Sequence, residues 1–142
     1  MFITTADLYS NKPQETIDLV SDTDPSIVDI IINEEIEVMR SYLSAYDHEA
    51  IFNATGNNRS VIIMKYLKDL VIYELYNRRS HELNPVAEKG FNEAMNWLDK
   101  VSTGKLVPGL PKKQIDKDGN GQADSDAKHY TFGGNKNYHN KI

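Results

Sequence analysis

Apolar side chains recur at helical spacing in three segments of the chain, at residues 26–46, 60–79 and 85–102. In the first segment they step by three or four positions, which places them on one face of a helix. The acidic residues that follow its apolar start favour a helix over a strand there. The second segment carries a broader apolar stripe, which is typical of a central helix contacted on two sides. The pattern predicts three long helices whose core contains Leu43, Leu67, Val71, Phe91, Trp97 and Leu98.

Shorter helical segments precede and connect the long ones. Residues 4–9 are expected to form a capped turn, because a threonine precedes it and Asp7 stands in its first turn. Residues 13–20 are expected to form a second short helix, which starts at a proline, a residue favoured at the first helical position. Residues 47–59 read as a connection with about one helical turn, ended by the run Gly56-Asn57-Asn58.

The composition of the chain changes beyond the third long helix. Gly104 is a good stop residue for that helix, and the prolines that follow prevent a new one. From residue 112 onward apolar side chains are scarce, and Gly, Asn, Asp and Lys dominate. Such a segment buries too little apolar surface to offset its ordering entropy. We therefore predict an all-α fold, a small helical bundle of three long helices plus short N-terminal helices at residues 1–111, followed by an extended or disordered C-terminal arm at residues 112–142.

Length and composition are those of one soluble domain. The chain has 142 residues, of which 26% are charged and 39% hydrophobic. It contains no cysteine, which excludes disulfides, thiol catalysis and thiolate metal sites and fits a reducing compartment. Its N-terminus lacks the features of a signal peptide, and no apolar run approaches the ~18 residues of a membrane span. We therefore expect no membrane partner.

Charge is unevenly distributed along the chain, whose net charge is −5. Residues 1–111 hold 10 Lys and Arg against 17 Asp and Glu, a net charge of −7, whereas residues 112–142 hold 6 Lys against 4 Asp, a net charge of +2. An acidic body disfavours non-specific binding to nucleic acid. The basic arm could meet a nucleic acid or an acidic neighbour, or it could be a solvated tail of mixed charge.

One stretch of the arm resembles the start of a calcium-binding loop. Its oxygen-bearing residues fall at positions that ligate calcium, with Gly121 at the sixth position. The candidate metal ligands are Asp116, Asp118, Asn120, Asp124 and Asp126. Ala127 occupies the twelfth position, where a bidentate Glu belongs, so we expect no tight calcium site. A calcium-responsive binding module built on residues 116–126 is the alternative function that this loop leaves open.

The remaining polar residues form no recognisable catalytic motif. The four histidines lack metal-ligand spacing, and no Ser, His and acid combination matches a nucleophile motif. The cluster of Glu34, Glu35 and Glu37 is interpreted as a solvated helix face. We therefore expect neither enzymatic activity nor a cofactor.

Tyrosines are frequent in the predicted helices. The candidates for a subunit interface are Tyr42, Tyr46, Tyr66 and Tyr76. Tyrosine is enriched at such interfaces, but it also packs half-buried with its hydroxyl group in solvent. The sequence leaves both interpretations open.

The order of several short patterns resembles one protein family. Residues 4–8, Thr-Thr-Ala-Asp-Leu, resemble the turn that opens its members, and Tyr42-Leu43 with Tyr46 resembles the end of their first long helix, although Ala45 replaces the usual arginine. The second helix carries Asp69, Tyr73, Leu75 and Arg78, and the third carries Pro85, Phe91, Ala94, Trp97-Leu98 and then Gly104-Lys105. These patterns are similar to the head-tail connector (adaptor or head-completion) proteins of tailed phages. The resemblance is strongest to their small helical branch, found in Mu-like phages and Bacteroides prophages.

The resemblance implies a structural virion protein. Members of this family are small helical bundles with extended arms, and they assemble as a ring below the portal, where they close the filled head and receive the tail. The expected partners are therefore other copies of this chain in a ring, the portal protein, and a tail or stopper protein. DNA would be met only by passage through the ring, and the chain would be made in the cytoplasm of the bacterial host.

Overall fold

The computed structural model describes residues 1–79 and 84–114 of the chain. Every regular element in this part is a helix, which confirms the predicted all-α class. The elements are η1 (Thr5–Ser10), α1 (Gln14–Val20), α2 (Pro25–Tyr42), α3 (His48–Phe52), η2 (Gly56–Asn58), α4 (Val61–Arg78) and α5 (Pro85–Ser102). The two η elements are short 3-10 helices of six and three residues, and the three long helices are those that the apolar pattern predicts.

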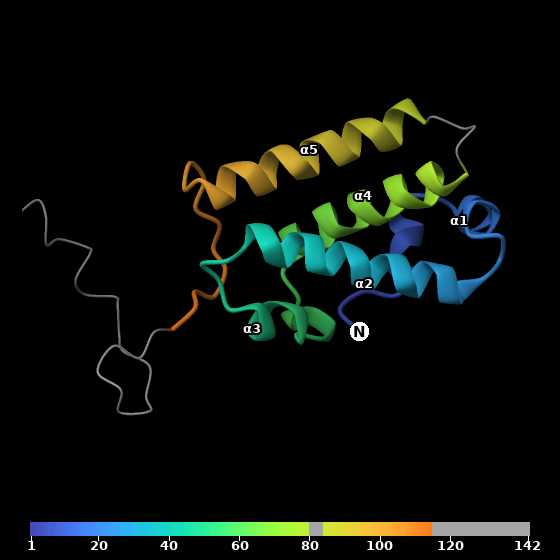
Figure 1. Ribbon diagram of the computed structural model, residues 1–142. Helices are drawn as coiled ribbons and strands as arrows, with labels where there is room; N and C mark the ends of the chain where they lie inside the picture. Colours follow the sequence, from blue (N-terminus) through green and yellow to red (C-terminus); the bar gives the residue numbers. More distant parts are fainter. Residues whose placement is uncertain (80–83, 115–142) are drawn as a thin grey trace, which may run out of the picture. The chain divides into compact units, whose positions relative to one another are not determined.

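Helix α4 is the centre of the bundle, because both other long helices pack against it (Figure 1). It is buried on two sides, as its broad apolar stripe predicts. Its buried side chains are Ile63, Leu67, Leu70, Val71, Ile72 and Leu75. Of the six residues expected in the core, five are buried, and Phe91 is half-buried against the core cluster. A single apolar cluster thus joins α2, α4, α5 and the N-terminal turns.

The helix starts follow local capping. Asn84 precedes α5, and its side-chain oxygen accepts the backbone N–H groups of Val86 and Ala87, each at 3.0 Å. Pro85 then occupies the first helical position, where its missing N–H costs nothing. Helix α5 therefore spans the predicted residues.

Helix α2 ends four residues earlier than the sequence predicts, at Tyr42 rather than Tyr46. Leu43 leaves the helical conformation, and its carbonyl pairs with Nε2 of His48 at 2.9 Å. Asp47 caps α3 by accepting the N–H of Ala50 at 3.0 Å. These contacts satisfy the backbone groups at the turn, so the apolar spacing that continues to Tyr46 does not extend the helix.

The turn between α1 and α2 contains two consecutive residues in the left-handed region, Asp22 at φ 57° and Thr23 at φ 58°. This conformation is unfavourable for residues other than glycine, and for a β-branched residue especially. Two arginines from the end of α4 hold the turn. Arg78 pairs with Asp22 at 2.9 Å, and Arg79 pairs with Asp22 at 3.2 Å and also bonds the carbonyl of Leu19.

The chain leaves α5 through a left-handed Gly104, at φ 78°, and returns to the domain. Leu110 is buried, and the N–H of Asp47 donates to the carbonyl of Pro111 at 2.8 Å. One compact unit comprises Met1–Pro111. Of the remaining unit, Lys112–Ile142, only the first three residues are described.

Candidate interaction surface

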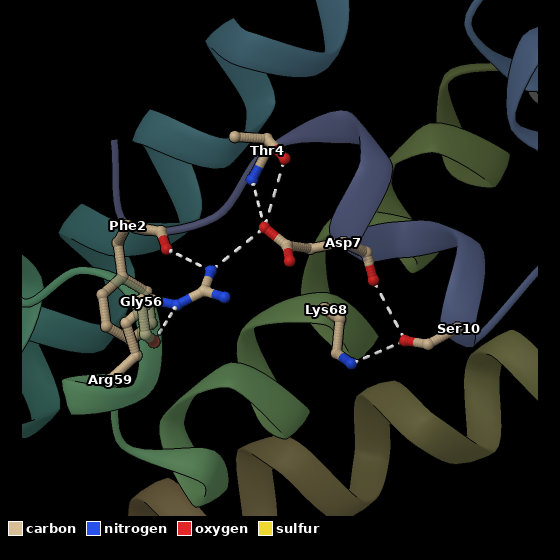
Figure 2. Close-up of polar contacts among 7 residues, drawn as sticks. All are labelled: Phe2, Thr4, Asp7, Ser10, Gly56, Arg59 and Lys68. Carbon is tan, nitrogen blue, oxygen red and sulfur yellow. Dashed lines mark hydrogen bonds and ion pairs between the residues drawn. The ribbon is translucent and has the colours of Figure 1, made fainter.

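The N-terminal segment is fixed to the bundle by Arg59 (Figure 2). The guanidinium of this residue donates to the Phe2 carbonyl at 2.9 Å and pairs with the Asp7 carboxylate at 3.1 Å. Its Nε donates to the Gly56 carbonyl at 3.0 Å. The backbone N–H of Thr4 donates to the same Asp7 carboxylate at 2.8 Å. Burial alone would raise the pKa of Asp7, but its hydrogen bonds to Thr4 and its contact with Arg59 hold that pKa below the usual value.

A second polar junction lies at Asp69 in the middle of α4. Its carboxylate accepts from Lys65 one turn earlier and from Asn11 after η1, both at 3.1 Å. Helix α5 passes close by at Gly90, where an added Cβ would lie 3.3 Å from the Asp69 carboxyl. Beside this junction is a depression of about 120 Å³, whose lining includes Val86. Asp69 therefore ties η1 to α4 and requires a small residue on α5.

Aromatic pairs join α4 to α5. Tyr66 stacks on Trp97 with ring centroids 4.9 Å apart, and Tyr73 stacks on Phe91 at 4.1 Å. Stacked pairs of this kind add to the area that the rings bury. The residues on which the family resemblance rests at Asp69, Tyr73 and Trp97 are thus contacts between helices.

The four tyrosines predicted as interface candidates lie at different depths. Tyr46 is buried in the core, whereas Tyr42, Tyr66 and Tyr76 are half-buried against it. Lys65 lies over the ring of Tyr66 at 4.4 Å, and Lys12 lies over that of Tyr76 at 5.9 Å. All four therefore contribute to packing within the chain, and only the three half-buried rings offer surface to a neighbour. Their role in an interface stays a prediction.

Other apolar side chains are more exposed than these tyrosines, and the sequence patterns did not single them out. Val61 is 80% exposed, Val107 71% and Val86 67%. Leu19 and Ile30 are also exposed, on α1 and α2. Val61 and Val86 stand at the starts of α4 and α5, and Val107 follows α5. Apolar periodicity within a helix carries no information about neighbouring chains. These residues are among the large apolar side chains that the described domain leaves exposed.

Glu35 corrects the interpretation of the acidic cluster on α2. Glu34 and Glu37 are exposed as expected, but Glu35 retains only 7% of its accessible surface. A usable signal was present in the sequence, because Glu35 stands four residues after Ile31 and four before Met39, both buried. Residues spaced by four share a helical face. The cluster is therefore split between solvent and the interior.

The candidate calcium ligands, at residues 116–126, lie outside the described residues. Within the described ranges, no group of three His, Cys, Asp or Glu side chains is arranged to hold a metal ion. The imidazole of His48 is engaged with the carbonyl of Leu43, at the end of α2. None of the helices that the structure describes is both long and apolar enough to cross a membrane.

Comparison with protein families gives a match over most of the chain. A family model described as Bacteriophage Mu, Gp36 matches residues 2–126, which include the whole helical domain and the chain just beyond it. No curated protein and no solved structure shows a significant match to the chain.

Proposed function

This chain belongs to the bacteriophage Mu Gp36 family, and from that premise we propose that it is a structural protein of the virion, a head-to-tail connector subunit. It would form a ring with other copies of itself below the portal protein and join or close the filled head to the tail. The observation that carries the proposal is the family match over residues 2–126, together with the connector-like patterns at the helix contacts. Both the domain and the start of the arm fall within the match.

The contacts of the domain support a scaffold function. The connector-like residues near the N-terminus form the capping box of η1, in which Asp7 is also held by Arg59. Those on α4 and α5 tie α4 to Asn11, after η1, through Asp69, and stack α4 on α5 through the rings of Tyr73 and Phe91. A bundle fastened in this way is a unit that can be repeated around a ring. Its mechanism would be packing, with no bond made or broken.

The exposed surface suits binding to protein better than binding to DNA. The exposed apolar side chains, such as Val61 and Val86, provide area for contact with neighbouring subunits. The domain at residues 1–111 carries a net charge of −7, which disfavours adhesion to phosphate groups. DNA would therefore pass through the ring without being held, and the partners would be the portal above and a tail or stopper protein below.

The C-terminal arm would extend the reach of each subunit. A compact bundle contacts few neighbours, whereas a polar segment that orders on binding can cover a large partner surface. We propose that residues 112–142 contact the portal, a neighbouring subunit or a tail protein in the assembled particle.

The experiment that tests this function inactivates the gene in the phage or prophage that encodes it. Electron microscopy of the induced lysate is expected to show heads and separate tails that do not join. The full chain supplied in trans should restore tailed particles, and the protein should be found at the head–tail junction of purified virions. Infectious, tailed particles without the protein would overturn the connector function.

The role of the arm is tested in the same complementation. A chain without residues 112–142 is expected to fold but to leave heads and tails unjoined. If that shortened chain restores infectious particles, the arm is dispensable and its proposed contacts are wrong. Restoration by the full chain only when calcium is present would instead favour the calcium-responsive alternative.

A further inference from the structure

Glu35 occupies an apolar position in the buried stripe of α2. The side chains of Val28, Ile32 and Met39 are fully buried, and Ile31 retains 7% of its accessible surface. Glu35 follows this spacing of three and four residues and is itself 7% exposed. An ionised carboxylate is among the most costly groups to bury without a partner. The position therefore favours an apolar or neutral side chain.

The surroundings of the Glu35 carboxyl group offer no compensating charge. No residue in the described part of the chain forms a hydrogen bond or an ion pair with it. The charged groups that act on it are Glu74 from α4 and Glu34 from its own helix, and both are acidic. Ionisation would thus place a third negative charge beside two others.

Charges on the other elements are directed elsewhere. On α4, Lys65 pairs with Asp69, Lys68 donates to the hydroxyl of Ser10, and Arg78 pairs with Asp22. The charged residues of α5 are all exposed: Glu88, Lys89, Glu93, Asp99 and Lys100. The one charge of η1, Asp7, pairs with Arg59. The elements packed around α2 therefore leave Glu35 facing acidic neighbours.

We propose that Glu35 is a proton-operated switch of the contact between α2 and α4. When its carboxyl group is neutral, Glu35 packs with the apolar stripe and α2 stays closed on α4. When the group ionises, it is repelled by Glu74 and requires water, and α2 opens away from α4. The switch is a property of the folded domain, so it does not depend on the connector function.

The direction of the pH dependence follows from the protonation of the two states. Burial, and after it the charges of Glu74 and Glu34, raise the pKa of Glu35 from 4.5 to about 7. In the open state the carboxyl group is solvated and loses its proton at the lower value. Between pH 4.5 and about 7 the open state is ionised while the closed state still holds its proton, so the closed contact weakens as the pH rises. Above about pH 7 both states are ionised, and the contact weakens no further. The opening equilibrium should change by on the order of 100-fold across this window.

Two measurements on the full-length chain test the switch. Carbon-detected NMR of the glutamate carboxyl groups is expected to show that one of them titrates near pH 7, and that this signal is absent in Glu35→Gln. Hydrogen exchange of the α2 amides, corrected for the intrinsic effect of pH, is expected to be faster at pH 8 than at pH 5. Glu35→Gln should keep the slow exchange at both values.

Matched variants separate the switch from a general effect of charge. Glu34→Gln removes a neighbouring exposed charge and should keep the pH dependence with a slightly lower midpoint. Glu74→Gln should lower the midpoint more, because the charge of Glu74 raises the pKa of Glu35 more than that of Glu34 does. A wild-type Glu35 that titrates near 4.5, or exchange in α2 that depends on pH equally in Glu35→Gln, would overturn the proposal. The carboxyl titration of the wild-type chain decides the matter even if Glu35→Gln does not fold.

Discussion

At the scale of single residues, Arg59 joins three segments that are distant in the sequence. It binds the Phe2 carbonyl, the Gly56 carbonyl and the Asp7 carboxylate, and its side chain is 20% exposed. A planar guanidinium can serve several acceptors in fixed directions, whereas a lysine ammonium cannot reach all of them at once. The arginine is therefore expected to set the position of the N-terminal segment.

We predict that Arg59→Ala lowers the free energy of unfolding by about 2–4 kcal/mol, because it leaves a carboxylate and two carbonyls without their charged partner. Arg59→Lys should lower the free energy of unfolding by less than Arg59→Ala does. The control Lys89→Ala, at an exposed residue, should change that free energy by less than about 0.5 kcal/mol. Urea denaturation at pH 7 measures all three. The depressed pKa of Asp7 adds a second signature. Its contribution is present above pH 3.8, the ordinary pKa, and is lost as the pH falls further, so the difference between Arg59→Ala and wild type should shrink in acid.

Gly90 is required by its neighbour rather than by its backbone conformation. A Cβ at this position would lie 3.3 Å from the Asp69 carboxyl, which is held in place by Lys65 and Asn11. In a helix, alanine is otherwise favoured over glycine by about 1 kcal/mol. Whether Gly90→Ala stabilises or destabilises the domain therefore depends on whether the Asp69 carboxylate is present.

We predict that Gly90→Ala destabilises the wild-type chain by about 1–2 kcal/mol through overpacking. In an Asp69→Ala background the same change should stabilise the domain by up to about 1 kcal/mol, because only the helix preference remains. Gly109→Ala is the control, since nothing lies within 4 Å of its added Cβ. A double-mutant cycle in urea measures the coupling. Equal effects of Gly90→Ala in both backgrounds would show that Asp69 is not the obstacle.

At the scale of elements, the contact between α4 and α5 carries the largest aromatic groups of the bundle. Trp97 is 7% exposed and stacks on Tyr66, while Tyr73 and Phe91 form a second stack along the same pair of helices. These contacts join residues that lie on either side of positions 80–83 in the sequence. The stability of the contact between α4 and α5 should therefore depend on the buried ring of Trp97 more than on the half-buried rings.

We predict that Trp97→Ala costs about 3–5 kcal/mol, the usual loss for a buried large aromatic residue. Phe91→Ala should cost less, because Phe91 is only partly buried. Thermal unfolding followed by circular dichroism gives both values. Trp97 is the only tryptophan, so its fluorescence should be blue-shifted in the native chain and move to the red on unfolding. A red-shifted emission from the folded chain would contradict its burial.

At the scale of the whole molecule, the helical domain closes on itself before the arm begins. Its C-terminal exit is fixed by the buried Leu110 and by the bond from Asp47 to the Pro111 carbonyl. All buried residues in the described part of the chain lie between positions 2 and 110. The domain therefore contains its own core.

We predict that deletion of residues 115–142 changes the melting temperature by less than about 2 °C, because it removes no described core contact. Deletion of residues 110–142 should lower it clearly, since it also removes Leu110 and the acceptor for Asp47. Calorimetry of the two shortened chains makes the comparison. A chain that unfolds when only residues 115–142 are removed would show that the arm belongs to the core.

The sequence by itself determined the elements of this protein. Helical apolar spacing, proline at the first position of α5 and glycine after its end are local signals, so the three long helices and the bounds of α5 could be predicted without a structure. The all-α class follows from them. The family patterns were also readable, because each is a short run of residues close together in the sequence.

Only the tertiary structure decided which of these residues meet. The end of α2 at Tyr42, the burial of Glu35 and the approach of Gly90 to Asp69 each depend on partners that lie far away in the sequence or on another helix. A helical pattern states which side of a helix is apolar, but not where on that side a neighbouring helix crosses it. Glu35 is the clearest case. Its acidic neighbours in the sequence indicated solvent, whereas its spacing from Ile31 and Met39 indicated the interior. The packing of α2 against α4 decided between the two, because burial is settled by contacts between helices rather than by local composition.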